Sequence, residues 1–281
     1  MLYIIPFLLS FSLMAKVSAT WLGVGTIILE DDHNTIIFDP AFTTPGIFSI
    51  LGITEFRSDT TLVKKILNNY QLKKVDGVFV THTHYDHVID APEVARLTGA
   101  TLYGDGNLKR IAKAYGVNVS PLTNIQIGNF KISAFERHHS RIFQWLDFLP
   151  GEVPEDFSFS YYDYKVGKAW IYVVEHKDGN ILIDDSPGEA TGLPPINIQI
   201  VFQGIANRAS EDEVLDGHVK TFHPRKFIPI HFDNFFRDFD MRKGTLLPFV
   251  KLPEFELAFK KKYSDIELHR PIMGEKIQLF P

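Results

Sequence analysis

Apolar and polar positions alternate along this chain with two different periods. Short runs rich in β-branched and aromatic residues, bounded by Gly, Pro, Asn and Asp, predict buried strands. Between them, apolar residues recur every three or four positions, which is typical of amphipathic helices. One such stripe runs from Leu62 to Tyr70 after a Ser58-Asp59 cap, and another helix is expected to end at Gly99. This alternation of strands and helices predicts an α/β fold.

The same arrangement of elements occurs twice. A strand-rich segment followed by helices spans residues 20 to 135 and again 167 to 281. The first half opens with strands at residues 21–29 and 35–38, and the second with a hairpin about Lys177-Asp178-Gly179. A later helix, residues 211–222, carries His218 on its expected solvent face. The repeat is the one expected for two sheets packed face to face with helices outside.

Composition narrows the classes of function. With 281 residues, of which 45% are hydrophobic, the chain can bury a sizeable core as one large domain or two small ones. The net charge of −5, without a long basic run, argues against a nucleic-acid partner. Because the chain has no cysteine, disulfides and thiolate ligands are excluded, and any metal must be held by His, Asp and Glu.

Residues 1–19 differ from the rest of the chain. An uncharged apolar run from Leu2 to Met14 has the length of a signal peptide and is short for a membrane span, and Val17-Ser18-Ala19 offers small residues for cleavage. We expect a signal peptide over residues 1–19, a domain over 20–281, and export to the periplasm or medium. No Lys or Arg precedes the run, so an N-terminal membrane anchor is the alternative, and membrane contact is expected only if these residues are retained.

The densest group of candidate ligands follows a short apolar strand. Residues 78–80 lead directly into Thr81-His82-Thr83-His84-Tyr85-Asp86-His87, and Asp90-Ala91-Pro92-Glu93 then resembles a helix start with a capping carboxylate. Imidazole and carboxylate ligands suit zinc, iron or manganese. Three His and one Asp within one turn have little use in an ordinary solvated loop. The segment therefore predicts a metal site on a loop between strand and helix.

The spacing His-x-His-x-Asp-His after a buried strand resembles the signature of the metallo-β-lactamase fold superfamily of metal-dependent hydrolases. The resemblance extends from about Trp21 to the end of the chain. It implies an αββα sandwich of two mixed β-sheets packed face to face, with helices on the outer faces. His138-His139-Ser140-Arg141 is similar to the branch that includes N-acylphosphatidylethanolamine phospholipase D, its bacterial relatives and lactonase-like enzymes.

The resemblance also implies a set of metal ligands. It assigns one metal to His82, His84 and His138, a second to Asp86, His87 and His231, and places Asp185 between the two. Asp39 matches an acid that supports the metal loop without binding the metal itself; a turn-forming Asp before Pro is the alternative. His139 is the alternative to His138. Asp184 is the alternative to Asp185, because the motif commonly has glycine before its acid and this chain has Asp184.

Such ligands imply hydrolysis. Two cations, most simply zinc with manganese or iron as alternatives, would share a water molecule and convert it to hydroxide near neutral pH. Asp86 or Asp185 would orient this hydroxide or accept its proton, as the predicted catalytic residues. The bond cleaved would be an ester-type or a phosphodiester bond. His84 stands where the redox diiron branch of the superfamily typically has Glu, which favours hydrolysis over oxygen chemistry.

Two aromatic-rich loops, at residues 41–57 and 141–166, are predicted to border the cleft, with packed connecting segments as the alternative. As cleft walls they favour a partly apolar small molecule such as a lactone or an acylated phosphodiester. A non-catalytic metal- or ligand-binding module is the alternative function, and a nuclease or a β-lactamase is disfavoured. The sequence gives no prediction of oligomeric state.

Overall fold

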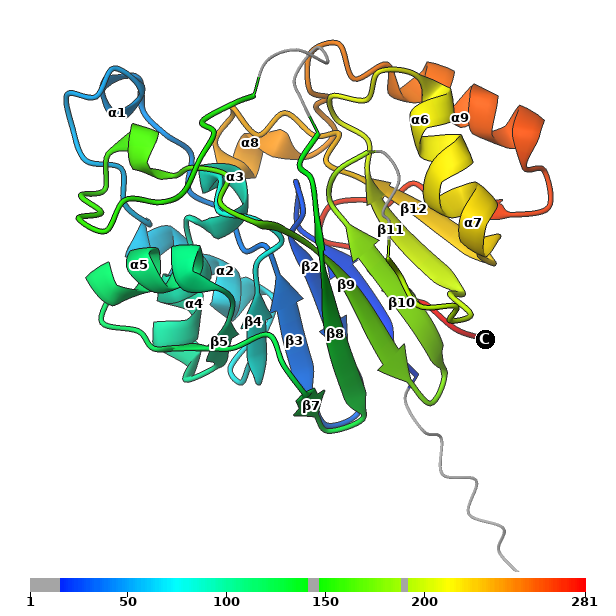
Figure 1. Cartoon of the computed structure of the whole chain (residues 1–281), viewed down its shortest axis with the longest axis horizontal. Coiled ribbons are helices and arrows are strands. Elements are labelled where there is room, and N and C mark those ends of the chain that lie inside the picture. Colours follow the sequence, from blue (N-terminus) through cyan, green and yellow to red (C-terminus); the bar gives the residue numbers. More distant parts are fainter. Residues whose placement is uncertain (1–15, 141–146, 188–191) are drawn as a thin grey trace, which may run out of the picture.

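Two mixed sheets of seven strands each pack face to face, with helices on their outer faces (Figure 1). The computed structural model describes residues 16–140, 147–187 and 192–281. In Figure 1 helices α2, α4 and α5 lie beside one sheet, and α6, α7 and α9 beside the other. The predicted sandwich is confirmed.

The first sheet has the strand order β14-β1-β2-β3-β4-β5-β6. Its strands are β1 (Ser18–Trp21), β2 (Ile27–Glu30), β3 (Thr35–Phe38), β4 (Gly77–Phe79), β5 (Thr101–Tyr103), β6 (Val119–Ser120) and β14 (Lys276–Gln278). From β3 to β6 neighbouring strands are parallel. Parallel neighbours need crossover connections, which here contain α2 (Thr60–Asn69), α4 (Ala91–Thr98) and α5 (Gly106–Ala114).

The second sheet has the order β13-β12-β11-β10-β9-β8-β7. Its strands are β7 (Ile125–Ile127), β8 (Phe130–Arg137), β9 (Ala169–His176), β10 (Gly179–Asp184), β11 (Ile200–Gly204), β12 (Lys226–Ile230) and β13 (Glu267–Leu268). The predicted hairpin about residues 177–179 is the β9–β10 pair. The helical layer consists of α6 (Glu211–Val214), the π-helical turn η2 (Leu215–Val219), α7 (Lys220–Phe222) and α9 (Leu252–Lys262).

Four short helical segments lie in the loops: α1 (Ile47–Ile50), α3 (Tyr85–Val88), η1 (Tyr161–Asp163) and α8 (Phe239–Arg242). Local signals set several boundaries. Asp59 caps α2 by accepting hydrogen bonds from the backbone N–H groups of Thr61 and Leu62, and Gly99 ends α4 in the left-handed conformation, as predicted. Asp90 precedes α4 but does not cap it. Its carboxylate accepts instead from backbone N–H groups of the loop at residues 42–43.

One expectation about the first strands needs correction. The single strand predicted over residues 21–29 is divided into β1 and β2 by a turn. The predicted domain boundary after Ala19 lies inside β1, where Val17 and Ala19 are buried and the carbonyl of Val17 accepts from the backbone N–H of Leu279 at 3.0 Å. Residues 1–15 lie outside the described residues, so the signal peptide stays a prediction. Within the described ranges, no helix has the length and apolar character to span a bilayer.

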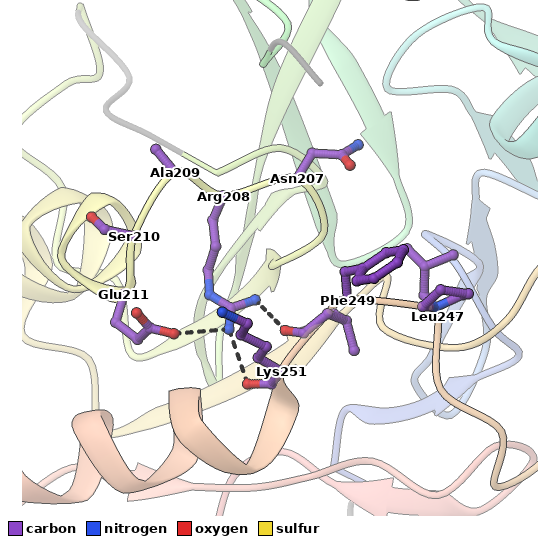
Figure 2. Close-up of a pocket in the computed structure, with 10 residues that line it drawn as sticks. Asn207, Arg208, Ala209, Ser210, Glu211, Leu247, Phe249 and Lys251 are labelled. Carbon is purple, nitrogen blue, oxygen red and sulfur yellow. Dashed lines mark hydrogen bonds and ion pairs between the residues drawn. The ribbon is translucent and has the colours of Figure 1, made fainter. Parts of the chain in front are cut away.

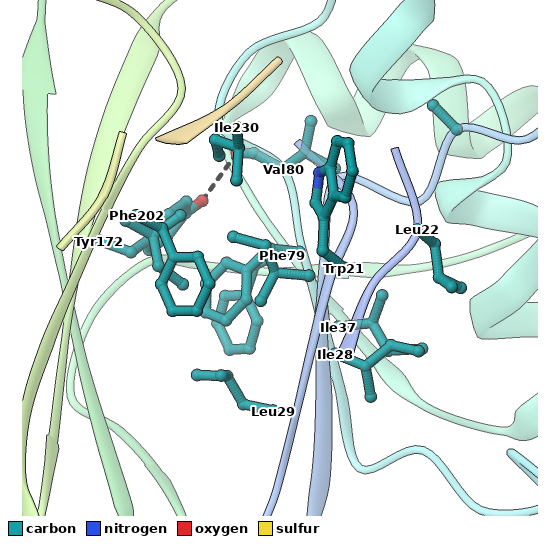
Figure 3. Close-up of a cluster of buried hydrophobic side chains, with 14 of the residues drawn as sticks. Trp21, Leu22, Ile28, Leu29, Ile37, Phe79, Val80, Tyr172, Phe202 and Ile230 are labelled. Atoms are coloured by element: carbon teal, nitrogen blue, oxygen red, sulfur yellow. Dashed lines mark hydrogen bonds between the residues drawn. The ribbon is translucent and has the colours of Figure 1, made fainter. Parts of the chain in front are cut away.

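The core fills the space between the two sheets (Figure 3). Phe79 of β4 stacks on Phe38 and Tyr103, with ring centroids 5.1 and 4.9 Å away, and meets Tyr172 of β9 edge-on. The Tyr172 hydroxyl donates to the carbonyl of Val80 at 2.8 Å, across the gap between the sheets. Each fully buried side chain of this size contributes roughly 1.5–3 kcal/mol. The end of β4, from which the ligand-rich loop starts, is therefore held from both sheets.

Candidate metal centre

The candidate ligands converge from the ends of five strands. The loop Thr81–His87 follows β4, Asp39 follows β3, His139 follows β8, Asp185 follows β10 and His231 follows β12. These positions are far apart in the sequence, yet their side chains form three groups of metal-ligand type. The strand ends therefore supply the positions and the cassette supplies most of the ligands.

The first group consists of His82, His84 and His139, whose ligand nitrogens all lie within 4.8 Å of one another. His82 Nε2 and His84 Nδ1 are 3.0 Å apart. His84 Nε2 donates to the carbonyl of Phe148 at 2.8 Å, which leaves the Nδ1 lone pair directed at the group. Burial lowers the pKa of His84 to about 4 and that of His139 to about 3. Both rings are thus neutral near pH 7, as a metal ligand must be.

His139, and not the preferred His138, joins this group. His138 is exposed and takes no part in it. Along β8 the buried Ile132 alternates with the exposed Lys131, and continued alternation would turn position 138 inward. The burial alternation is already lost after Ile132, however, and the strand itself ends at Arg137, one residue before the histidines. The structure therefore places His139, the alternative, in this group and leaves His138 outside it.

The second group consists of Asp86, His87 and His231. Asp86 Oδ2 lies 3.7 Å from His87 Nε2 and 3.5 Å from His231 Nε2. Burial opposes the charged form of His87, but the carboxylates of Asp185 and Asp86 hold its pKa well above its ordinary value. The carboxylate of Asp86 has its pKa lowered despite burial, with His87 as the main opposing influence. The carboxylates around His87 therefore favour positive charge at this group.

Asp185 lies beside the second group and forms the third one with Asp39 and His87. Its Oδ2 is 3.0 Å from His87 Nδ1 and 3.5 Å from His231 Nδ1. Both of its oxygens are buried without a hydrogen-bond partner among the described residues. A buried, unsatisfied carboxylate is costly unless it coordinates a cation or pairs with one. Together with the donor set of nitrogen and oxygen, this fits a zinc-like divalent ion, for which these residues provide two adjacent positions.

Asp39 supports the loop as the sequence implied. Its Oδ1 accepts from the backbone N–H of Thr81 at 2.6 Å, and its Oδ2 accepts from His87 Nδ1 at 2.9 Å. This second contact fixes the orientation of the His87 ring. Gly25, which the sequence did not single out, permits the close approach, because a Cβ there would lie 2.6 Å from Asp39 Oδ2 and 3.0 Å from Asp185. Its position inside the strand predicted over residues 21–29 gave no signal of this role.

Asp184 faces away from the ligands. Successive residues at the end of β10 point to opposite sides of the sheet, so Asp185 enters the space between the sheets and Asp184 enters the helical layer. There it pairs with Arg137 and with His218. His218 is buried, in contrast to the solvent-facing position expected for it, and the helix that carries it is interrupted at Gly217.

The cavities differ in their relation to this centre. One of about 500 Å³ is lined by His138, His139, Phe148 and Lys168 and therefore opens beside the first ligand group. Another of about 500 Å³ lies at residues 207–211 and 247–251 (Figure 2). In Figure 2 the guanidinium of Arg208 is tied to Glu211 and to backbone carbonyls of Val250 and Lys251. None of the candidate ligand groups of the described chain lies among its lining residues.

The aromatic loops are largely packed on themselves. Phe56 meets Tyr85 and Tyr164 edge-on at 5.6 and 5.7 Å, and Tyr161 packs on Tyr85 at 5.1 Å. Residues 141–146 of the predicted lid lie outside the described residues. Phe148 contacts His84 and borders the cavity beside the first ligand group. Most of these rings therefore pack behind the ligand loop and do not line the cavity beside it.

Residues 19–155 match the family model described as the metallo-beta-lactamase superfamily. A UPF0173 metal-dependent hydrolase from Rubrobacter xylanophilus is 33% identical over 127 residues, which cover 44% of this chain and 50% of that protein. The chain thus spans about half the length of the curated relatives it matches.

Solved structures agree with the fold. Igni18, a metallo hydrolase from the archaeon Ignicoccus hospitalis, superposes with a TM-score of 0.56 at 19% identity, covering 94% of this chain and 98% of that one. An isothiocyanate hydrolase from Delia radicum gut bacteria gives a TM-score of 0.57 at 17% identity, covering 94% and 100%. At these identities the likeness concerns the arrangement of the chain alone.

Proposed function

We propose that this chain is a metal-dependent hydrolase of the metallo-beta-lactamase superfamily, with two divalent cations held at the ends of its strands. The observation that carries the proposal is Asp185. Both of its oxygens are buried without a hydrogen-bond partner among the described residues, and its Oδ2 lies 3.0 Å from His87 Nδ1 and 3.5 Å from His231 Nδ1. Zinc is the metal favoured by this donor set, with manganese or iron as alternatives.

The residues have separate tasks. Bound cations would supply an activated water nucleophile and polarise the scissile bond. The carboxylate of Asp86 or of Asp185 would orient the nucleophile or accept its proton. Asp39 holds the ring of His87, and the carbonyl of Phe148 holds that of His84. Buried imidazoles and carboxylates exclude bulk water from the reacting atoms, which strengthens every electrostatic contact there.

The proposed substrate is a small molecule with an ester-type or phosphodiester bond and a partly apolar body. The cavity beside His139 has about 500 Å³, within the range of small-molecule sites. It combines the ring of Phe148 with the charged or polar side chains of Lys168 and His138. Such a lining accommodates an apolar group next to a polar reacting centre.

The test uses the whole chain loaded with zinc, manganese or iron. Metal content per chain and hydrolysis of bis(p-nitrophenyl) phosphate and of a long-chain lactone are measured for the parent, His139→Ala and His138→Ala. We expect two metals and turnover of at least one substrate in the parent, loss of metal and activity in His139→Ala, and retained metal in His138→Ala. A parent that binds metal without turning over either substrate would favour the binding-module alternative, and a parent without metal would refute the proposal.

A further inference from the structure

A second polar cluster lies on the far side of the strand that carries Asp185. It consists of Arg137 at the end of β8, Asp184 at the end of β10 and His218 in η2. All three side chains are buried: those of Arg137, Asp184 and His218 are 6%, 1% and 2% exposed. Burying charged groups is costly, so such a cluster persists only where its members satisfy one another or serve a function.

Arg137 connects two loops that carry proposed ligands. Its Nη1 donates to the carboxylate of Asp184 and to the carbonyl of Ser186 at 2.9 Å, and Nη2 donates to the carbonyl of Pro187 at 2.7 Å. To reach β10 the side chain must cross the end of β9, where its register partner is Ala169. A residue as small as Ala leaves the guanidinium room to pass. Arg137 therefore joins strands that are not neighbours.

Asp184 is held from three directions. Besides Arg137, its Oδ2 accepts from His218 Nε2 at 2.7 Å, and its Oδ1 accepts from the backbone N–H of Ser186 at 3.1 Å. Gln203 of β11 donates to the carbonyl of Asp184 at 3.3 Å and to that of Ser186. The residues on both sides of Asp185 are thereby fixed, and the peptide between them has little freedom to rotate.

His218 brings the helical layer into this arrangement. It lies in a π-helical turn in which Gly217 leaves the helical conformation, with φ −79° and ψ −118°. π-helical turns are rare, and many of them lie at functional sites. Here the break places the ring of His218 over the end of β10. A continuous amphipathic helix, as the sequence predicted, would have left this side chain toward solvent.

We propose that Arg137, Asp184 and His218 are positioning residues that hold His139 and Asp185 in the geometry the metal centre requires. Arg137 lies two residues before His139, and its Nε donates to the intervening carbonyl of His138 at 2.9 Å. The same side chain donates hydrogen bonds to the backbone carbonyls of the loop after Asp185. One guanidinium thus sets the separation of two ligands that come from non-adjacent strands. The inference rests on the proposed metal centre.

The test compares His218→Gln with His218→Leu. Both replacements fill the buried space, but only the Gln amide can donate a hydrogen bond to Asp184. Zinc affinity is measured on folded protein by competition with a chromophoric chelator, in parallel with the melting temperature. We expect His218→Leu and Asp184→Asn to weaken zinc binding by about 10- to 100-fold, as the loss of groups that orient ligands typically does. His218→Gln should remain close to the parent.

His176→Leu is the matched control. His176 is another buried histidine, located at the opposite end of β9 from Ala169, and its Nδ1 accepts from the backbone N–H of Asp178 at 3.1 Å. We expect this variant to lower the melting temperature without changing zinc affinity. The control therefore separates general destabilisation from an effect on the ligands.

The outcomes are distinct. Unchanged zinc affinity in both His218→Leu and Asp184→Asn, with a parent that binds zinc, would overturn the positioning role and leave the proposed function intact. Equal weakening in His218→Leu and His176→Leu would also overturn it. A parent that binds no zinc would overturn the metal centre and this inference with it. If His218→Leu does not fold, zinc affinity is compared in Asp184→Asn and Arg137→Lys instead. We expect Asp184→Asn to show the same loss of zinc affinity.

Discussion

The hydroxyl of Tyr172 provides a direct test of how the core supports the metal loop. It donates across the sandwich to the carbonyl of Val80, two residues before His82, at 2.8 Å (Figure 3). Burial raises the pKa of Tyr172 well above its usual range, so the hydroxyl keeps its proton at every working pH. Tyr172→Phe removes this donor and leaves the ring, and hence the packing against Phe38 and Phe79, in place.

The expected loss of unfolding free energy follows from the buried carbonyl that the substitution leaves without a donor. The carbonyl of Val80, in a residue that is 3% exposed, would lose its partner in the core. A buried acceptor without a partner costs about 1–3 kcal/mol. The matched control is Tyr162→Phe, because Tyr162 also donates to a backbone carbonyl at 2.8 Å but is 51% exposed. Water replaces the lost donor there, so we expect a change of less than about 0.5 kcal/mol.

Urea unfolding followed by tryptophan fluorescence measures both variants. The midpoint for Tyr172→Phe should fall at an unchanged slope, since a lower midpoint with a constant slope means lower stability and not altered compactness. The thermal midpoint should fall by roughly 2–4 °C per kcal/mol. Equal midpoints for Tyr172→Phe and Tyr162→Phe would refute the reasoning, because they would show that the inter-sheet hydrogen bond contributes no more than an exposed one.

Two further predictions concern the chain start and acid stability. A chain that begins at residue 20 lacks the buried Val17 and Ala19 of the first sheet, so it should unfold at lower urea than one that begins at residue 16; equal midpoints would show that cleavage after Ala19 leaves the fold intact. The hydrogen bond from Arg96 lowers the pKa of Glu93. The ionised Glu93 therefore stabilises the fold fully above the unfolded-state pKa of about 4.3, and this stabilisation is lost as pH falls through the folded-state pKa. The free energy of unfolding should therefore fall less steeply with decreasing pH in Glu93→Gln than in the control Glu254→Gln, whose residue is exposed in the first turn of α9. Parallel curves of unfolding free energy against pH for the two variants would contradict this.

Features encoded by neighbouring residues were accessible from the sequence. The cassette at residues 82–87, the cap at Asp59 and the end of α4 at Gly99 all depend on spacing within a few positions. The order of strands and helices, and with it the sandwich, follows from apolar periodicity in the same way. His231 was assigned by the resemblance to the family, whose last ligand motif follows an apolar strand as His231 follows β12.

Features that depend on where the pairing between two strands ends could not be predicted from the sequence. Whether His138 or His139 turns inward is decided by the end of β8 at Arg137, and strand ends are set by partners distant in the sequence. Phe56 and Tyr161 pack on Tyr85, which favours the packed alternative for these parts of the two loops, whereas residues 141–146 lie outside the described residues.

By itself, then, the sequence determined the fold class and the ligands of the cassette, since local periodicity and spacing encode both, and the resemblance to the family implied the remaining ligands. The tertiary structure alone decided which of two adjacent histidines and which of two adjacent aspartates face the centre. It also decided that His218 is buried against Asp184. The physical reason is that a side chain's direction at a strand end depends on hydrogen bonds to other strands and helices, and those contacts form only when the sheets are assembled.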